Sequence, residues 1–203
     1  NIFNIRYGFF GGSFNPPTKA HEELAKEIMK EFNLDKLFFV PVGNTYQKNG
    51  LIDEKDRYRM LNILFEEEEK IEVSDLELQT KQILKAIDVF SLIEEKYKHE
   101  EIFYIMGDDN LEKTPNWKSA EELLKNHKFI ILKRNNKELK ELIQNSNMLW
   151  KYKENFYESK MQKLIPYSSS QVRKAIQLGN TEEIEKMVNP KVYQYITERN
   201  LYQ

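Results

Sequence analysis

The chain has 203 residues, of which 40% are hydrophobic and 32% are charged, and its formal net charge is −2 at pH 7. This length and composition predict a globular fold with a sizeable hydrophobic core. The nearly balanced charge excludes a general attraction to nucleic acid or to an anionic membrane surface. The absence of cysteine excludes disulfide bonds and thiolate metal sites. We therefore expect no nucleic-acid or membrane partner and no dedicated metal site. No apolar run approaches the length of a membrane span and no signal peptide is visible, so a cytoplasmic location is expected by default.

Five short apolar segments are predicted to be β-strands, namely 5–10, 36–42, 71–76, 102–106 and 129–132. Most are continuously apolar, which is typical of strands that are covered on both faces of a sheet. Helical patterns lie between them, at 22–32, 56–65, 83–97 and 120–124. This alternation predicts an α/β fold with a doubly wound parallel sheet. Ligands are then expected beyond the carboxyl ends of the strands, where Gly11, Gly43 and Gly107 would gather.

The remaining segments are predicted to be mostly helical. Residues 135–162 are polar, and we expect a surface helix at 137–144 followed by a less regular connection. Three helices are expected near the C-terminus, at 170–178, at 181–188 with Thr181 as its cap, and from Pro190 to about residue 199. These three helices predict a small C-terminal extension over about 168–203.

A glycine-rich turn is the segment that points most directly to chemistry. Gly11-Gly12-Ser13-Phe14 follows the first predicted strand directly and precedes the first predicted helix. A strand, a tight turn and a helix start together form a geometry that binds phosphate through backbone N–H groups. Thr18 and His21 lie one helical turn apart at that helix start. Thr18 suits the N-cap, and His21 can donate a hydrogen bond to a phosphoryl oxygen.

Two segments at opposite ends of the chain carry a family resemblance. The segment from Gly11 to His21 resembles the (H/T)-x-G-H signature of the nucleotidyltransferase superfamily, with Ala20 in place of the usual glycine. Residues 168–173, Ser-Ser-Ser-Gln-Val-Arg, resemble the later I-S-S-T-x-I-R element of that superfamily. The resemblance implies a Rossmann-like single nucleotidyltransferase domain over 1–203.

Three further segments resemble the nicotinate (nicotinamide) mononucleotide adenylyltransferases within that superfamily. They are Gly107-Asp108-Asp109 followed by Trp117, the loop with Lys48 followed by Arg57 and Met60-Leu61, and the closing segment 192–202. In that family, a basic residue of the loop meets the mononucleotide phosphate. A usual Ser-Tyr-Thr run, however, is replaced here by Leu84-Lys85-Ala86.

The resemblance assigns roles to individual residues. It implies the catalytic residues His21, Thr18 and Arg173. It implies that ATP is bound by Gly11, Gly12, Ser13, Phe14, Gly107, Asp109, Ser169 and Ser170. It implies that the mononucleotide is bound by Lys48 and Trp117, with the indole stacking on the pyridine ring. Lys85 lies where the usual Ser-Tyr-Thr run is replaced, and we expect it to bind the mononucleotide by replacing some contacts to phosphate or carboxylate.

The activity that the resemblance implies is adenylyl transfer from ATP to nicotinate mononucleotide. Mg²⁺ would enter bound to the phosphates of ATP. Three alternatives remain open at this point: nicotinamide mononucleotide as acceptor, phosphopantetheine as acceptor, and an ATP-binding module without turnover.

Overall fold

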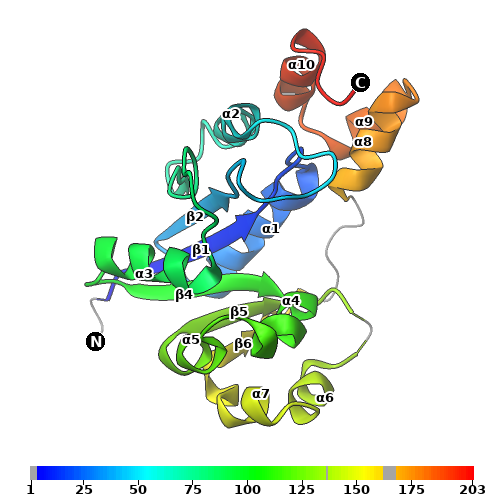
Figure 1. Ribbon diagram of the computed structural model, residues 1–203. Coiled ribbons are helices and arrows are strands. Elements are labelled where there is room, and N and C mark those ends of the chain that lie inside the picture. The colour runs from blue at the N-terminus through cyan, green and yellow to red at the C-terminus, as the bar shows by residue number, and fades with distance from the viewer. Residues whose placement is uncertain (1–3, 136, 162–167) are drawn as a thin grey trace. The chain divides into compact units, whose positions relative to one another are not determined.

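A computed structural model describes residues 4–135, 137–161 and 168–203 (Figure 1). Its strands are β1 (Arg6–Gly12), β2 (Lys36–Pro41), β3 (Ile71–Val73), β4 (Glu101–Gly107), β5 (Lys128–Leu132) and β6 (Phe156–Glu158). Its α-helices are α1 (Lys19–Glu31), α2 (Glu54–Leu64), α3 (Ala86–Lys96), α4 (Asp108–Lys113), α5 (Ala120–Asn126), α6 (Leu139–Gln144), α7 (Asn147–Lys151), α8 (Ser169–Gln177), α9 (Thr181–Met187) and α10 (Pro190–Glu198). Short 3-10 turns occupy Thr114–Asn116 and Lys153–Asn155.

The described strands form one six-stranded sheet in the order β3-β2-β1-β4-β5-β6. This is the strand order of the Rossmann fold. Strand β1 pairs in parallel with β4, β4 with β5, and β5 with β6. The predicted Rossmann-like α/β fold is confirmed, and all five strands expected from the sequence are present.

The chain divides into two compact units, each of which gathers segments that are distant in sequence. Unit 1 comprises Asn1–Phe10, Glu27–Leu37 and Leu84–Leu164, and unit 2 comprises Gly11–Lys26, Phe38–Ile83 and Ile165–Gln203. The expected single domain stays a prediction, and the two units are described separately below.

The core of unit 1 is built on β4 and β5, which run side by side in Figure 1. Every residue from Ile102 to Gly107 is buried, which explains why the run is continuously apolar. On one side, the ring of Phe90 from α3 stacks on Tyr104 with 3.6 Å between centroids. This packing anchors α3 against β4 and holds the carboxyl end of β4 in a fixed position.

The core of unit 2 joins β2 to the C-terminal helices through aromatic and polar contacts. Phe39 stacks on Phe65 with 4.6 Å between ring centroids. On α2, the Asp56 carboxylate accepts hydrogen bonds from the Tyr195 hydroxyl and from Arg199 Nε, both at 2.7 Å. The C-terminal helical extension predicted for about 168–203 is confirmed as α8, α9 and α10; residues 162–167 lie outside the described part.

Several local predictions were wrong. Helix α4 begins directly after β4, where no helix was predicted, and α7 and β6 occupy the connection that was expected to be less regular. Strand β6 is three residues long and mostly exposed, so it lacks the apolar signal of a buried strand. Helix α9 is capped by Asn180, whose side chain accepts from the Glu183 N–H, rather than by Thr181. No helix within the described residues is long and apolar enough to cross a membrane.

Candidate active site

The glycine-rich turn lies at the carboxyl end of β1 and leads into α1. Phe14 has φ of 48°, and its ring is buried against Phe39 at 5.2 Å between centroids. A side chain on Gly12 would approach that ring at 3.1 Å, so the tight approach favours glycine there. Since the Phe14 ring faces the core, any contact of this residue with a ligand would be made by its backbone.

Thr18 and His21 are brought together at the start of α1. Thr18 is completely buried, and its carbonyl accepts from the N–H groups of His21 and Glu22, which begins the helix. The Thr18 backbone N–H donates to His21 Nδ1 at 2.9 Å, and Thr18 Oγ1 lies 3.3 Å from the same nitrogen. Because a backbone N–H can only donate, Nδ1 is the acceptor, and in the neutral ring the proton is on Nε2. This tautomer makes Nε2 a hydrogen-bond donor.

Helix α8 is fastened to the glycine-rich turn from the other end of the chain. Ser169 Oγ donates to the Pro16 carbonyl at 2.7 Å, and Arg173 Nη1 donates to the Asn15 carbonyl at 2.8 Å. Arg173 Nη2 also lies 3.3 Å from Ser170 Oγ. The structure therefore fastens Ser169 and Arg173 to the backbone that follows the glycine-rich turn, with Ser170 beside Arg173. Their roles toward ATP stay predictions.

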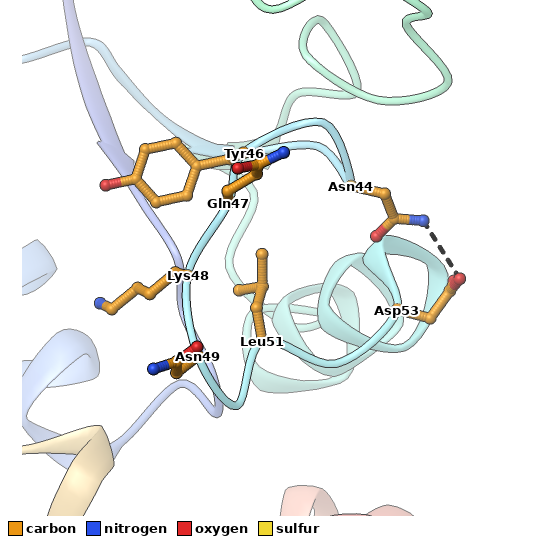
Figure 2. Close-up of a pocket in the computed structure, with 7 residues that line it drawn as sticks. All are labelled: Asn44, Tyr46, Gln47, Lys48, Asn49, Leu51 and Asp53. Atoms are coloured by element: carbon orange, nitrogen blue, oxygen red, sulfur yellow. Dashed lines mark hydrogen bonds between the residues drawn. The ribbon is translucent and has the colours of Figure 1, made fainter.

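The loop 43–53, which we call the acceptor loop, follows β2. It forms an open pocket of about 720 Å³ lined by Asn44, Tyr46, Gln47, Lys48, Asn49, Leu51 and Asp53. Figure 2 shows Tyr46, Lys48 and Asn49 extending to the same side of the loop, and the Asn44 side chain bonded to Asp53. Lys48 is exposed, so its ammonium group is available to an anionic ligand.

Arg57, which carries part of the family resemblance, is a buried brace of the acceptor loop. Its side chain is completely buried, and burial lowers the pKa of its guanidinium. Nη1 donates to the carbonyls of Ser13 (3.1 Å) and Val42 (2.7 Å), and Nε donates to the carbonyl of Ile52 (2.9 Å). Arg57 thus ties the ends of the acceptor loop to the glycine-rich turn.

Glu54 is a second brace of the acceptor loop, and the sequence did not reveal it. Its buried carboxylate accepts from the N–H groups of Asn44 at 3.2 Å and Gln79 at 2.6 Å. The side chain of Asn44 in turn accepts from the Glu54 N–H at 2.8 Å. A Cβ atom at Gly43 would collide with the Glu77 carbonyl oxygen, so glycine is required where the segment after β3 crosses the loop.

In unit 1, the end of β4 forms what we call the Gly107 corner, made by Gly107, Asp108, Asp109 and Arg134. Asp108 is buried and accepts from the N–H groups of Arg134 (2.9 Å) and Asn135 (3.2 Å), so it has a structural role. Asp109 Oδ1 is buried without a hydrogen-bond partner among the described residues, and Arg134 Nε lies 4.0 Å from it. A Cβ atom at Gly107 would collide with Asp109 Oδ1 and would approach Arg134 within 2.7 Å.

The other predicted site residues of unit 1, Trp117 and Lys85, lie at the ends of helical segments. Trp117 is half-buried at the end of the 3-10 turn after α4, and its backbone N–H donates to the Thr114 carbonyl at 2.9 Å. Lys85 is exposed directly before α3, and its N–H donates to Asp88 Oδ2 at 2.9 Å. Asp88 therefore has a structural role as part of the start of α3.

Comparison with known proteins identifies the family. The cytidylyltransferase-like family model matches residues 9–175. A protein of Acholeplasma laidlawii named "Probable nicotinate-nucleotide adenylyltransferase" is 32% identical over 195 residues, covering 96% of each chain. A protein of the same name from Fusobacterium nucleatum is 31% identical over 198 residues, covering 95% of this chain and 97% of its own. The chain belongs to the nicotinate-nucleotide adenylyltransferases.

Solved structures agree with this family at the level of the fold. The nicotinic acid mononucleotide adenylyltransferase of Plasmodium falciparum complexed with NaAD has a TM-score of 0.79 and 23% identity, over 98% of this chain and 97% of its own. The same enzyme complexed with APC has a TM-score of 0.80. This adenylyltransferase chain therefore shares its fold with an enzyme whose structures are complexed with NaAD and with APC.

Two residues near the predicted site, Arg134 and Asn15, were not singled out from the sequence, although both lie next to predicted strand or turn segments. Arg134 follows β5, and basic residues at the carboxyl end of a parallel strand are placed to meet anionic ligands. Asn15 lies inside the glycine-rich segment itself, yet its contacts are to residues distant in sequence. Within the described ranges, no group of three or more His, Asp or Glu side chains has the geometry of a metal site.

Proposed function

We propose that this adenylyltransferase transfers the adenylyl group of ATP to nicotinate mononucleotide, releasing nicotinate adenine dinucleotide and pyrophosphate. An oxygen of the mononucleotide phosphate attacks the α-phosphorus of ATP in line. The bond from that phosphorus to the oxygen bridging to the β-phosphate breaks, and the electron pair leaves with pyrophosphate. Such a transfer needs positioning and charge neutralisation rather than a covalent enzyme intermediate.

The observation that carries the proposal is the hydrogen bond from the Thr18 N–H to His21 Nδ1. It sets the tautomer in which Nε2 donates, and it does so at a helix start where the backbone dipoles favour a negative phosphoryl group. A donor held in advance where charge develops in the transition state contributes to catalysis without reorganising during the reaction. Thr18 therefore orients His21, and His21 stabilises the transferred phosphoryl group.

The other substrate contacts follow from the charges and shapes at the two units. Arg173 and the Ser170 hydroxyl suit the outer phosphates of ATP, because guanidinium and helix-start donors together favour a polyphosphate. Ser169 gives its hydroxyl proton to the Pro16 carbonyl, so its proposed contact with ATP would use its backbone N–H at the start of α8. Asp109, with its unpartnered Oδ1, suits a ribose hydroxyl, since a buried acceptor without a partner is satisfied by an added donor. Lys48 and Lys85 supply positive charge for the mononucleotide, and Trp117 supplies a ring for stacking.

We further propose that Mg²⁺ enters with ATP, held by phosphate oxygens and water. Mg²⁺ favours such ligands and gives up its water reluctantly. When bound, the ion would neutralise charge on the phosphates. We place the reaction in the cytoplasm, where ATP is available.

The decisive experiment incubates the protein with Mg²⁺ and ATP and one acceptor at a time: nicotinate mononucleotide, nicotinamide mononucleotide or phosphopantetheine. Products are identified by mass. The proposal requires a dinucleotide with the nicotinate acceptor at the highest kcat/KM. Turnover confined to phosphopantetheine, or ATP binding without any product, would refute it.

A further inference from the structure

Asn15 is a buried junction between the glycine-rich turn and the acceptor loop. Its side chain Nδ2 donates to the Gly50 carbonyl at 2.8 Å, and its Oδ1 accepts from the Ile52 N–H at 3.3 Å. The same Oδ1 accepts from the Tyr202 hydroxyl at 2.8 Å. The residue is 2% exposed, so both ends of its amide are satisfied by protein groups. Its orientation thus depends on three partners, and one of them is 187 residues away in sequence.

The backbone around Tyr202 has an uncommon conformation. The chain turns back after α10, and Asn200 and Tyr202 both have positive φ, 53° and 67°. Such a conformation disfavours a residue with a β-carbon, so the contacts of the side chain must offset it. The ring is buried, and burial raises the pKa of its hydroxyl, so that the hydroxyl stays protonated and donates to Asn15.

We propose that Tyr202 is a positioning residue for the acceptor side of the reaction, acting through Asn15. Its hydroxyl holds the Asn15 amide in the orientation that fixes Gly50 and Ile52, and therefore the acceptor loop with Lys48. The inference rests on the proposed function, because that function assigns the loop to the mononucleotide.

The contacts of Asn15 also predict for which substrate the KM changes when the Tyr202 hydroxyl is removed. Its side-chain amide bonds to the acceptor loop, whereas its backbone carbonyl accepts from Arg173. Loss of the Tyr202 hydroxyl removes a donor from Oδ1 and leaves the backbone carbonyl unchanged. The effect is therefore expected in the KM for the mononucleotide, with little change in kcat or in the KM for ATP.

Tyr202→Phe is the test, and Tyr195→Phe is its matched control. Tyr195 belongs to the same C-terminal segment and also donates through its hydroxyl, but to Asp56 on α2. Trypsin cleavage after Lys48, followed by mass spectrometry, reports the order of the acceptor loop without any reference to activity. We expect Tyr202→Phe to speed this cleavage and to raise the KM for nicotinate mononucleotide, each roughly fivefold, since one hydrogen bond is lost. Tyr195→Phe should match the wild type in both.

The outcomes separate this inference from the proposed function. A folded Tyr202→Phe protein with wild-type cleavage after Lys48 overturns the inference, as does an equal effect of Tyr195→Phe. If the wild type makes no dinucleotide, the proposed function fails, while faster cleavage of Tyr202→Phe would still establish control of the loop by Tyr202. Thermal unfolding of both variants, with cleavage measured well below each midpoint, ensures that local opening is compared rather than global unfolding.

Discussion

The glycine-rich turn of unit 2 and the Gly107 corner of unit 1 differ in how their polar groups are satisfied. In the turn, the carbonyls of Ser13, Asn15 and Pro16 accept from Arg57, Arg173 and Ser169. Arg57 Nη2 is the exception, since it has no partner in the described part of the chain. At the Gly107 corner, the atom without a hydrogen-bond partner among the described residues is an acceptor, Oδ1 of the half-buried Asp109, although Arg134 Nε lies 4.0 Å from it.

This difference indicates two ways of preparing a binding site. The carbonyl oxygens of the turn would repel a phosphate, and donors from α2 and α8 neutralise them while fixing the backbone. The Gly107 corner instead retains an acceptor that a ligand donor can satisfy. We therefore expect loss of the buried Arg57 donor to lower stability, loss of the donors beside the turn to affect catalysis or ATP binding, and substitutions in the segment after the Gly107 corner to affect ligand affinity alone.

The largest effect is expected from removing the buried donor of the turn. Arg57→Met leaves three partly buried carbonyl groups without their charged donor, which should lower the free energy of unfolding by about 3 kcal/mol. Urea unfolding measures it. Arg59→Met is the control, because Arg59 is exposed on the same helix and should cost less than about 0.5 kcal/mol. Equal losses in the two variants would contradict the role of Arg57 as a brace.

The next largest effect is expected on kcat, from removing the imidazole of His21 at the start of α1. His21→Ala should lower kcat by roughly 10²–10³-fold with the fold retained, as is typical of losing one transition-state donor. Steady-state kinetics and circular dichroism measure the two quantities. His99→Ala, at an exposed position, should leave kcat unchanged. Near-normal turnover of a folded His21→Ala protein would make His21 a structural residue.

Arg173→Ala tests whether the guanidinium serves the polyphosphate as well as the turn. We expect the KM for ATP to rise by about tenfold or more, because hydrogen bonds to charged groups contribute about 1.5–3 kcal/mol. The KM for the mononucleotide should rise much less. Lys174→Ala, exposed on the same helix, provides the control. Equal weakening of both substrates would remove the polyphosphate assignment.

Glu77, which lies against the acceptor loop, predicts a pH-dependent stability. Burial raises the pKa of its carboxyl to about 7, above its ordinary value of 4.5. The folded state therefore binds this proton more tightly than the unfolded state, and stability is lost as the pH rises from about 4.5 through 7. Glu77→Gln should raise the free energy of unfolding by about 1–3 kcal/mol near pH 8.5 and by little near pH 4. An equal change at both pH values would contradict this explanation.

The smallest effect is expected in unit 1, at the aromatic residue that follows the Gly107 corner. Trp117→Ala should raise the KM for the mononucleotide by roughly 3- to 10-fold, because ring stacking contributes about 0.5–1.5 kcal/mol beyond burial. The KM for ATP should change little. Trp150→Ala is a matched control, since Trp150 is 45% exposed and its ring lies under the Lys153 ammonium group. If both variants behave as the wild type, the stacking role is refuted.

Local sequence patterns were sufficient for the elements that form the core and for the turn. The strands β1, β2, β4 and β5 were predicted because residues buried on both faces must be apolar over a continuous run. The turn was predicted because glycines between a strand and a helix start allow a tight turn whose backbone N–H groups can bind a phosphate. Strand β6 was missed for the same reason, since an exposed three-residue strand carries no such constraint.

Tertiary structure alone decided which polar residues are exposed and which are buried as braces of the backbone. Arg57 and Lys48 are both basic residues around the acceptor loop, yet the first is completely buried and the second is exposed. The hydrogen bond between Tyr202 and Asn15 joins opposite ends of the chain, and no periodicity or motif encodes such a pairing. The physical reason is that burial and hydrogen-bond partners depend on which segments fold against one another, whereas patterns in the sequence report only the neighbours within one element.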